Sequence, residues 1–181
     1  MKRALLINGV PASGKSTIAN TLTPHLTSAG LNPVPFALDT VKEGLFAQIG
    51  TGDREYNRML GRASYHAIFN TIAAFPDRLL AVIDAWHGFQ PKDVLKDHLE
   101  RAKIDQVIEV WVAISPAIAA ARYIARSQER HAGHLPASYA DELLTLAGNA
   151  HPMGLGEVIT VDGNDSLTDD AIEKIIKQLH P

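Results

Sequence analysis

The chain has 181 residues, of which 46% are hydrophobic and 20% charged, with 17 basic residues against 20 acidic ones. This length suits one domain, residues 1–181, and the net charge of −3 gives no broad attraction for nucleic acid or an anionic membrane. The absence of cysteine excludes disulfides, thiolate chemistry and a four-cysteine zinc site. The apolar run after Lys2 and Arg3 is too short for a signal peptide or a membrane span, so we expect a cytoplasmic protein with no membrane partner.

Apolar runs alternate with helical periodicity along the first half of the chain. The run at 4–7 predicts a strand buried on both faces. A loop rich in glycine follows, and it leads into a helical pattern that Gly30 ends. Four further elements are predicted before residue 84: a proline-broken strand towards a sheet edge at 32–38, helices at 40–49 and 54–74, and a buried strand at 79–83.

The same alternation continues in the second half. Pro116 suits the first position of a helix that Ser115 caps, and we expect this helix to run into the arginine-rich segment 122–130. The other elements are predicted as helices at 92–102 and 137–146, strands at 107–114 and 158–161, and a closing helix capped by Thr168. Strands that alternate with helices indicate one α/β domain, in which helices cover both sides of a parallel sheet.

The loop after the first strand carries the most specific motif. Residues 9–16, GVPASGKS, fit the pattern G-x-x-x-x-G-K-[ST] at every fixed position, and we call them the P-loop. Glycine lets such a backbone wrap closely around a phosphate, while backbone N–H groups and the next helix N-terminus point at the anion. A chance match is the alternative, but the motif lies between a buried strand and a helix, as a nucleotide site requires.

Within the P-loop, Lys15 is expected to reach the β- and γ-phosphates and Ser16 to ligate Mg²⁺ through its hydroxyl. The predicted nucleotide contacts of this segment are Gly9, Pro11, Ala12, Ser13, Gly14, Lys15, Ser16 and Thr17.

Two aspartates follow predicted strands, at the sheet edge where ligands bind in open α/β sheets. Asp39 would accept a proton from a substrate hydroxyl that attacks the γ-phosphate; alternatively, it only caps the helix that begins at Thr40. Asp84 is placed like the residue that holds the Mg²⁺ water shell, although an ordinary strand-end aspartate is the alternative. Trp86 and His87 would line an acceptor pocket, unless His87 is an ordinary loop histidine.

Arginines recur at four-residue intervals near the predicted lid. On one helix, Arg122, Arg126 and Arg130 project from a single side, while Ala121 and Ile124 would face the core. Guanidinium groups in this place would clamp the transferred phosphoryl group and stabilise its charge. A solvated basic face is the alternative, but with a P-loop in the chain we favour Arg126 or Arg130 as a lid arginine.

Two further patterns favour structural interpretations. Arg54, Arg58 and Arg62 predict a solvated surface, with contact to an anionic acceptor as the alternative, because they lie opposite an apolar face. That face comprises Tyr56, Met59, Leu60, Ala63 and Ala67. His131 and His134 have the spacing of a metal pair, but no cysteine or obvious carboxylate partner supports zinc.

Four segments together resemble the P-loop small-molecule kinases: residues 9–17, FALDTVKEGLF around Asp39, VIDA at the end of the strand before Trp86, and RYIARSQERHAGH in the lid. The chain is most similar to the chloramphenicol phosphotransferase and zeta-toxin type of ATP-binding domain, and gluconate and shikimate kinases are more distant. It differs from those two kinases in having one aspartate at position 39 rather than an acidic pair.

This resemblance implies a three-layer P-loop NTPase fold with a five-stranded parallel sheet of order 2-3-1-4-5, helices on both faces and an arginine-rich lid at about 122–136. It implies ATP and Mg²⁺ as cofactors and a hydroxyl of a small molecule (a sugar, antibiotic or nucleoside-like compound) as acceptor. The matching catalytic residues are Asp39, Lys15 and Arg126 or Arg130, with Ser16 and Asp84 at the metal. Arg122 falls near the adenine, and Gly163 and Asn164 border the base.

Two other functions compete with this interpretation. One is a toxin-type kinase of a nucleotide-sugar or a nucleic-acid end, although the net charge of −3 argues against a long polyanion. The other is a nucleotide-binding regulatory ATPase without a small-molecule acceptor. GTP specificity has no support, because the chain has no N-K-x-D guanine motif.

Overall fold

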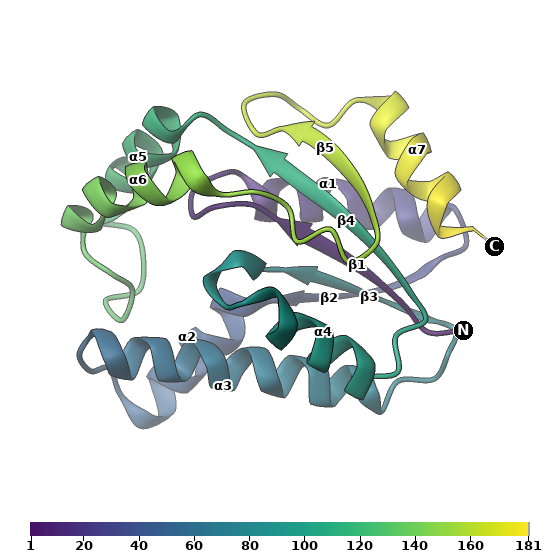
Figure 1. The fold of residues 1–181 in the computed structure, drawn as a ribbon, viewed down its shortest axis with the longest axis horizontal. Helices are drawn as coiled ribbons and strands as arrows, with labels where there is room; N and C mark the ends of the chain where they lie inside the picture. The colour runs from purple at the N-terminus through teal and green to yellow at the C-terminus, as the bar shows by residue number, and fades with distance from the viewer. Residues whose placement is uncertain (181) are drawn as a thin grey trace.

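The computed structural model describes residues 1–180 and builds one five-stranded parallel sheet of order β2-β3-β1-β4-β5 (Figure 1). This is the order that the family resemblance implies. The strands are β1 (Arg3–Asn8), β2 (Asn32–Ala37), β3 (Leu79–Asp84), β4 (Gln106–Ala113) and β5 (Glu157–Asp162). The helices are α1 (Lys15–Ser28), α2 (Leu38–Ile49), α3 (Arg54–Ala73), α4 (Lys92–Arg101), α5 (Pro116–Ala125), α6 (Ala140–Asn149) and α7 (Asp169–Leu179).

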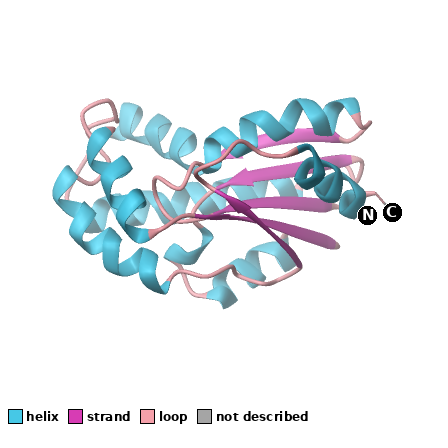
Figure 2. Cartoon of the chain, turned by 90° about the horizontal axis from the view of Figure 1, so that it is seen from above, coloured by secondary structure: helices cyan, strands magenta, loops and turns pink. Residues whose placement is uncertain are grey.

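Side chains of the central strand alternate between two cores, because successive residues of a strand point to opposite faces. Leu5 and Ile7 pack on the face covered by α1 and α7. Ala4 and Leu6 pack on the opposite face, against residues of α3 and α4. The three layers that result are seen from a second direction in Figure 2.

A third, smaller core lies beyond the carboxyl ends of the strands. Val10 and Ala12 of the P-loop pack there against α5 and α6, which Figure 1 shows at one end of the sheet. The segment between these two helices, residues 126–139, reaches towards α2 and α3, and we call it the lid loop. The P-loop is therefore fixed from the side of the lid as well as by its own strand and helix.

Several sequence predictions are confirmed in detail. The strand broken by Pro33 and Pro35 is β2, at the edge of the sheet, where a missing N–H is tolerated. Ser115 and Thr168 cap α5 and α7, each accepting a hydrogen bond from a backbone N–H of the first turn. No helix within residues 1–180 is long and apolar enough to cross a membrane.

The prediction of one helix through the arginine-rich segment is wrong. Helix α5 ends at Ala125 and Arg126 is its C-cap, so Arg130 lies in the lid loop. The Ser127 hydroxyl donates to the carbonyl of Ile124 at 2.8 Å, and such local bonds compete with helical ones. The predicted core contacts of this helix are also wrong, since Ala121 and Ile124 are exposed, the latter by 52%. The helix is instead anchored by Ala119 and Tyr123.

The buried face of α3 also differs from the prediction. Met59 is 46% exposed and Ala63 is exposed, whereas polar Asn57, Ser64 and Tyr65 are buried. An assignment by hydrophobicity alone misplaces this face, because part of it consists of buried polar groups. The predicted arginine surface is confirmed: the Arg54, Arg58 and Arg62 side chains are about half exposed and form ion pairs with Glu142 and Glu55.

Candidate functional site

The P-loop joins β1 to α1 in a tight backbone turn. Ala12 and Gly14 have φ angles of +66° and +99°, and the N–H of Ser13 donates to the carbonyl of Val10 at 3.1 Å. A Cβ on Gly9 would lie 2.6 Å from Ser13 Oγ, so no side chain fits there. Backbones with such alternating conformations form anion-binding concavities, and the following helix N-terminus adds its partial positive charge.

Lys15 and Ser16 emerge from the P-loop towards the end of β3. Ser16 Oγ donates to Asp84 Oδ2 at 2.5 Å, and Lys15 Nζ donates to the carbonyl of Val10 at 3.0 Å. Burial lowers the pKa of Lys15 to about 8, although Asp84 and Asp39 attract its charge. Burial likewise raises the pKa of Asp84, against the effects of Lys15 and Ser16. The protonation states of Lys15 and Asp84 therefore depend on each other, and Ser16 is hydrogen-bonded to Asp84.

The residues predicted to border the nucleotide base, Arg122, Gly163 and Asn164, lie together beside the P-loop. Arg122 donates to the carbonyl of Gly163 at 2.8 Å and to Asn164 Oδ1 at 3.3 Å. Gly163 is packed so closely that a Cβ on it would collide with the carbonyl oxygen of Ser13. Among the other predicted contacts, Thr17 has an exposed side chain on α1. Pro11 is half-buried and Ala12 buried within the loop.

Asp39 lies in the first turn of α2, close to the carboxyl end of β2. The residue that caps this helix is Ala37, so the alternative role of Asp39 as the N-cap is wrong. Ala37 pairs with Asp84 across β2 and β3, which brings Asp39 to the sheet edge that holds the P-loop. Partial burial raises the pKa of Asp39, but the positive charges around it, those of Arg130 and Lys15 among them, outweigh that effect and keep it below its usual value. Asp39 is thus an ionised carboxylate at neutral pH.

Both lid arginines face this edge of the sheet, although they do not share a helix. Arg130 Nη2 donates to Asp39 Oδ2 at 2.9 Å, and its side chain is 17% exposed. The Arg126 guanidinium has no hydrogen-bond or ion-pair partner within residues 1–180, and only the backbone of this residue forms hydrogen bonds. Burial and the nearby charge of Arg130 lower the pKa of Arg126, while Asp39 opposes them. Two guanidinium groups therefore lie near the Asp39 carboxylate, one of them paired with it.

A set of contacts that the sequence did not reveal docks the lid loop on α2 and α3. His134 contacts Glu43 at 2.7 Å between Nε2 and Oε1, and Asn57 donates its amide to the carbonyl of Gly133. Lys42 Nζ in turn donates to Asn57 Oδ1 at 2.6 Å. The only sequence signal was the spacing of His131 and His134, which resembles that of a metal pair but had no cysteine or carboxylate partner in its support. No cluster of three or more His, Cys, Asp or Glu side chains suited to a metal occurs within residues 1–180.

His87 does not line an acceptor pocket, because its side chain is fully buried. Its Nδ1 lies 2.7 Å from the hydroxyl of Tyr65, and burial lowers its pKa to about 3. The Asn8 side chain accepts from the backbone N–H groups of His87 (3.0 Å) and Gly9 (2.8 Å) and donates to Glu109 at 2.7 Å. Asn8 and Glu109, which sequence reasoning missed, thus fix the entry to the P-loop.

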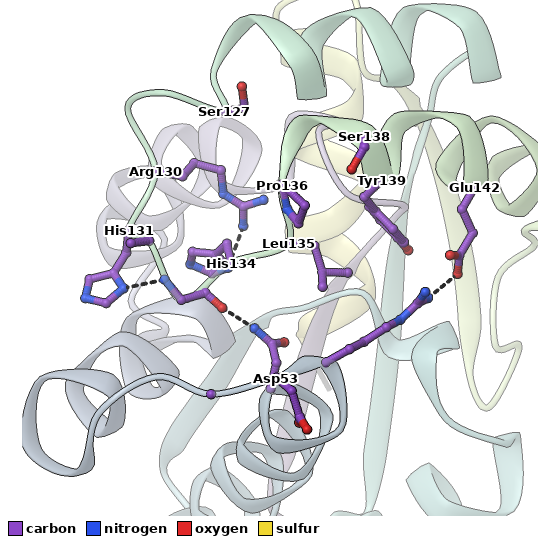
Figure 3. A pocket seen from close by; sticks show the side chains of 15 residues that line it. Asp53, Ser127, Arg130, His131, His134, Leu135, Pro136, Ser138, Tyr139 and Glu142 are labelled. Carbon is purple, nitrogen blue, oxygen red and sulfur yellow. Dashed lines mark hydrogen bonds and ion pairs between the residues drawn. The ribbon is translucent and has the colours of Figure 1, made fainter.

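A pocket of about 590 Å³ opens between the lid loop and the start of α3 (Figure 3). Arg54 and Glu142 form an ion pair on one wall, and the Arg54 guanidinium lies 5.9 Å from the centre of the Tyr139 ring. Arg130 lines this pocket and also binds Asp39, so one guanidinium group connects the pocket with the carboxylate. The pocket is large enough for a small molecule.

A P-loop at the carboxyl edge of a parallel 2-3-1-4-5 sheet, with an aspartate after the second strand and arginines in a lid, defines a P-loop kinase-like protein. The chain belongs to the adenylylsulphate kinase family, whose model matches residues 1–125. This family and its fold identify the protein as a phosphotransferase of the P-loop small-molecule kinase group.

Solved structures share the fold along nearly the whole chain. A "putative kinase" from Chloroflexus aurantiacus has 22% sequence identity and a TM-score of 0.81, with 99% of each chain covered. A sugar kinase from Janibacter sp. HTCC2649, solved without ligand, has 17% identity and a TM-score of 0.60, over 99% of this chain and 95% of that one. A comparison with curated proteins finds no match.

Proposed function

We propose that the protein transfers the γ-phosphate of ATP·Mg to a hydroxyl of a small molecule, with Asp39 as the base. The observation that carries this proposal is the meeting of three groups at one sheet edge: the P-loop, the ionised Asp39 carboxylate and the lid arginines. A regulatory nucleotide switch needs the first of these but has no use for a base that accepts the proton of an acceptor hydroxyl.

The residues at this edge fit the nucleotide and its metal ion. Hard oxygen ligands suit Mg²⁺, and Ser16 and Asp84 offer a hydroxyl and a carboxylate that lie 2.5 Å apart. When bound, Mg²⁺ would neutralise charge on the β- and γ-phosphates. Lys15 would add its ammonium to the same phosphates, and Arg122, Gly163 and Asn164 would border the base.

The chain's own residues supply the remaining chemistry. Asp39 takes the proton of the acceptor hydroxyl as its oxygen bonds to the γ-phosphorus and the bond to the ADP oxygen breaks. Arg126, whose guanidinium has no hydrogen-bond or ion-pair partner within the described residues, faces the charge that develops on the transferred group. Arg130 orients the Asp39 carboxylate, and the lid loop excludes water that would otherwise hydrolyse ATP.

The acceptor would enter through the pocket between the lid loop and α3. Its ionic groups balance in number, since Arg54 and Arg130 are matched by Asp53 and Glu142. Arg54 is already paired with Glu142, and Arg130 with Asp39. A neutral, hydroxylated acceptor of sugar-like size disturbs neither pair, whereas a strongly anionic one competes for the arginines. Support for this class also comes from the structural similarity to a sugar kinase.

The test compares Asp39→Asn with wild type in two assays, nucleotide binding by calorimetry and transfer from γ-labelled ATP to a panel of hydroxylated compounds. The panel contains neutral sugars, antibiotics, nucleosides and adenylylsulphate. We expect transfer to fall by about 10²-fold or more while ATP affinity changes less than threefold. Asp77→Asn is the matched control, because Asp77 is exposed and contacts the N-terminal amine instead. An unchanged transfer rate in Asp39→Asn would remove Asp39 from the role of base.

A further inference from the structure

His134 is almost enclosed between α2 and the lid loop, with a side chain that is 6% exposed. Its Nδ1 lies 3.0 Å from Arg130 Nη2, and its Nε2 lies 2.7 Å from Glu43 Oε1. A guanidinium group can only donate hydrogen bonds, so Nδ1 must accept. The ring proton then sits on Nε2 and is donated to Glu43. The contacts thus specify one neutral tautomer of the imidazole ring.

Arg130 is therefore held through one nitrogen, Nη2, which donates to two acceptors. Its Nη2 donates to Asp39 Oδ2 at 2.9 Å and to His134 Nδ1 at 3.0 Å. The guanidinium carbon lies 5.5 Å from the centre of the Tyr123 ring, which supports the group from the side of α5. Within residues 1–180, Arg130 is the one hydrogen-bond donor to the Asp39 carboxylate. The direction of that carboxylate depends on where the guanidinium is held.

The surroundings of the ring keep it in the accepting form. The Phe46 ring contacts His134 edge-on, with centroids 6.0 Å apart at 87°. Burial lowers the pKa of His134, and the charges of Arg130 and Lys42 act in the same direction, while Asp39 and Glu43 oppose them. At neutral pH the imidazole is uncharged, and Nδ1 is available to Arg130.

We propose that His134 is a positioning residue for phosphoryl transfer: its Nδ1 holds Arg130 against Asp39, and Glu43 fixes the tautomer that makes this possible. This inference rests on the proposed function, because it assigns His134 a part in aligning the base. The chain of contacts leaves α2 at Glu43, crosses the lid loop through His134 and Arg130, and returns to α2 at Asp39. Protonation of His134 would put a hydrogen on Nδ1 and break the contact with Arg130.

Two substitutions distinguish the roles of the two ring nitrogens of His134. In His134→Asn the side-chain oxygen can occupy the place of Nδ1 and accept from Arg130, while the contact with Glu43 is lost. In His134→Gln the longer amide can reach Glu43, while the acceptor beside Arg130 is lost. Both variants are neutral, so a difference between them reports the bond to Arg130 and not the charge of the histidine.

The readout is the pKa of the Asp39 carboxylate, followed by carbon-13 NMR in the full chain without added ligand. We expect this pKa to be higher in His134→Gln than in His134→Asn by about one unit, because Asp39 loses a fixed positive neighbour. The difference should disappear when each substitution is combined with Arg130→Ala. Equal pKa values in the two single variants, or a difference that survives without Arg130, would overturn the proposal.

A second readout is the kinetics of phosphate transfer from ATP·Mg to an acceptor identified in the panel of hydroxylated compounds. We expect His134→Gln to lower kcat at least tenfold with little change in the KM for ATP, and His134→Asn to recover most of that loss. A purely structural role would instead make the two variants equally unstable and equally slow. If wild type transfers phosphate to nothing, the proposed function fails, but the titration of Asp39 still decides whether His134 positions Arg130.

Glu43→Ala keeps the proposal testable if both His134 variants fail to fold. Glu43 is 42% exposed, so its removal leaves no large cavity. Without this acceptor the proton is no longer held on Nε2, and nitrogen-15 NMR of His134 should show the Nδ1–H tautomer in addition to the Nε2–H tautomer. An unaltered tautomer in Glu43→Ala would contradict the role assigned to Glu43.

Discussion

Replacement of Lys15 by methionine should stabilise the protein without nucleotide and strongly reduce its stabilisation by ATP. Burial lowers the pKa of Lys15 from 10.5 to about 8. At about 1.4 kcal/mol per pKa unit, the charged ammonium costs the folded state about 3 kcal/mol, and partial exposure reduces this to roughly 2 kcal/mol. The variant also loses the hydrogen bond from Lys15 Nζ to the Val10 carbonyl, although this carbonyl still accepts from the N–H of Ser13. This loss offsets about 1 kcal/mol of the gain in stability. We expect a net gain of about 1 kcal/mol.

Thermal unfolding with and without ATP·Mg measures both effects. A gain of about 1 kcal/mol corresponds to a Tm that is about 2–4 °C higher in a protein of this size. At a ligand concentration of about 100 times Kd, ATP·Mg should stabilise wild type by about 2.7 kcal/mol and Lys15→Met by much less. Without ATP·Mg the variant should have the higher Tm, and with ATP·Mg wild type should have the higher Tm.

The pH dependence of this difference has a defined sign. The unfolded chain keeps the Lys15 proton up to about 10.5, whereas the folded protein releases it near 8. The cost of the charge is therefore complete below pH 8 and disappears as the pH rises towards 10.5, so the advantage of the variant should shrink. Lys177→Met, at an exposed position in the last turn of α7, is the matched control and should show neither effect. A less stable Lys15→Met protein, or equal stabilisation of both proteins by ATP·Mg, would refute this reasoning.

Three further predictions concern the residues that hold the P-loop and the residues predicted to border the nucleotide base. Glu109→Ala should lower the free energy of unfolding by about 3 kcal/mol in urea denaturation, because a buried amide, a buried backbone N–H and a partly buried backbone N–H lose their acceptor. A loss under 1 kcal/mol would show that water replaces the carboxylate. Gly9→Ala should abolish ATP binding in calorimetry, since the added Cβ meets Ser13 Oγ. Binding at wild-type affinity would contradict this view of the loop. Arg122→Ala should raise the KM for ATP about tenfold and leave kcat nearly unchanged, because the guanidinium supports Gly163 and contacts no reacting group. A kcat that falls with an unaltered KM would instead place Arg122 at the phosphates.

Local signals were sufficient for most of the strands and helices and for the P-loop. The run at 4–7, the prolines at 33 and 35 and the caps at Ser115 and Thr168 act through neighbouring residues, so the sequence predicts them directly. The sheet order came from family resemblance, since neither composition nor periodicity specifies which parallel strands lie side by side.

The lid was the place where local reasoning failed. Four-residue spacing predicted one helix for Arg122, Arg126 and Arg130, but the helix ends at Ala125 and the lid loop folds back on α2. Arg126 and Arg130 nevertheless reach the predicted site from the loop. The contact of Arg130 with Asp39 therefore arises from the fold of the lid loop and not from the helical spacing.

The contacts that organise the site were beyond sequence reasoning because they join distant segments. Arg130 and His134 each contact α2 across 91 positions, at Asp39 and Glu43 respectively. Asn8 and Glu109 meet across 101 positions in the interior of the sheet. No periodicity marks such pairs, because the two partners of each pair come together only in the folded chain.

The central claim is that the γ-phosphate goes to a small molecule. The most direct measurement incubates the protein with γ-labelled ATP, Mg²⁺ and a low-molecular-weight fraction of cell extract, and separates the labelled products by chromatography. We expect label in an organic phosphate ester, formed by wild type and by Asp77→Asn but not by Asp39→Asn. Label that appears only in inorganic phosphate at the same rate in all three proteins would contradict the account and identify a nucleotide hydrolase.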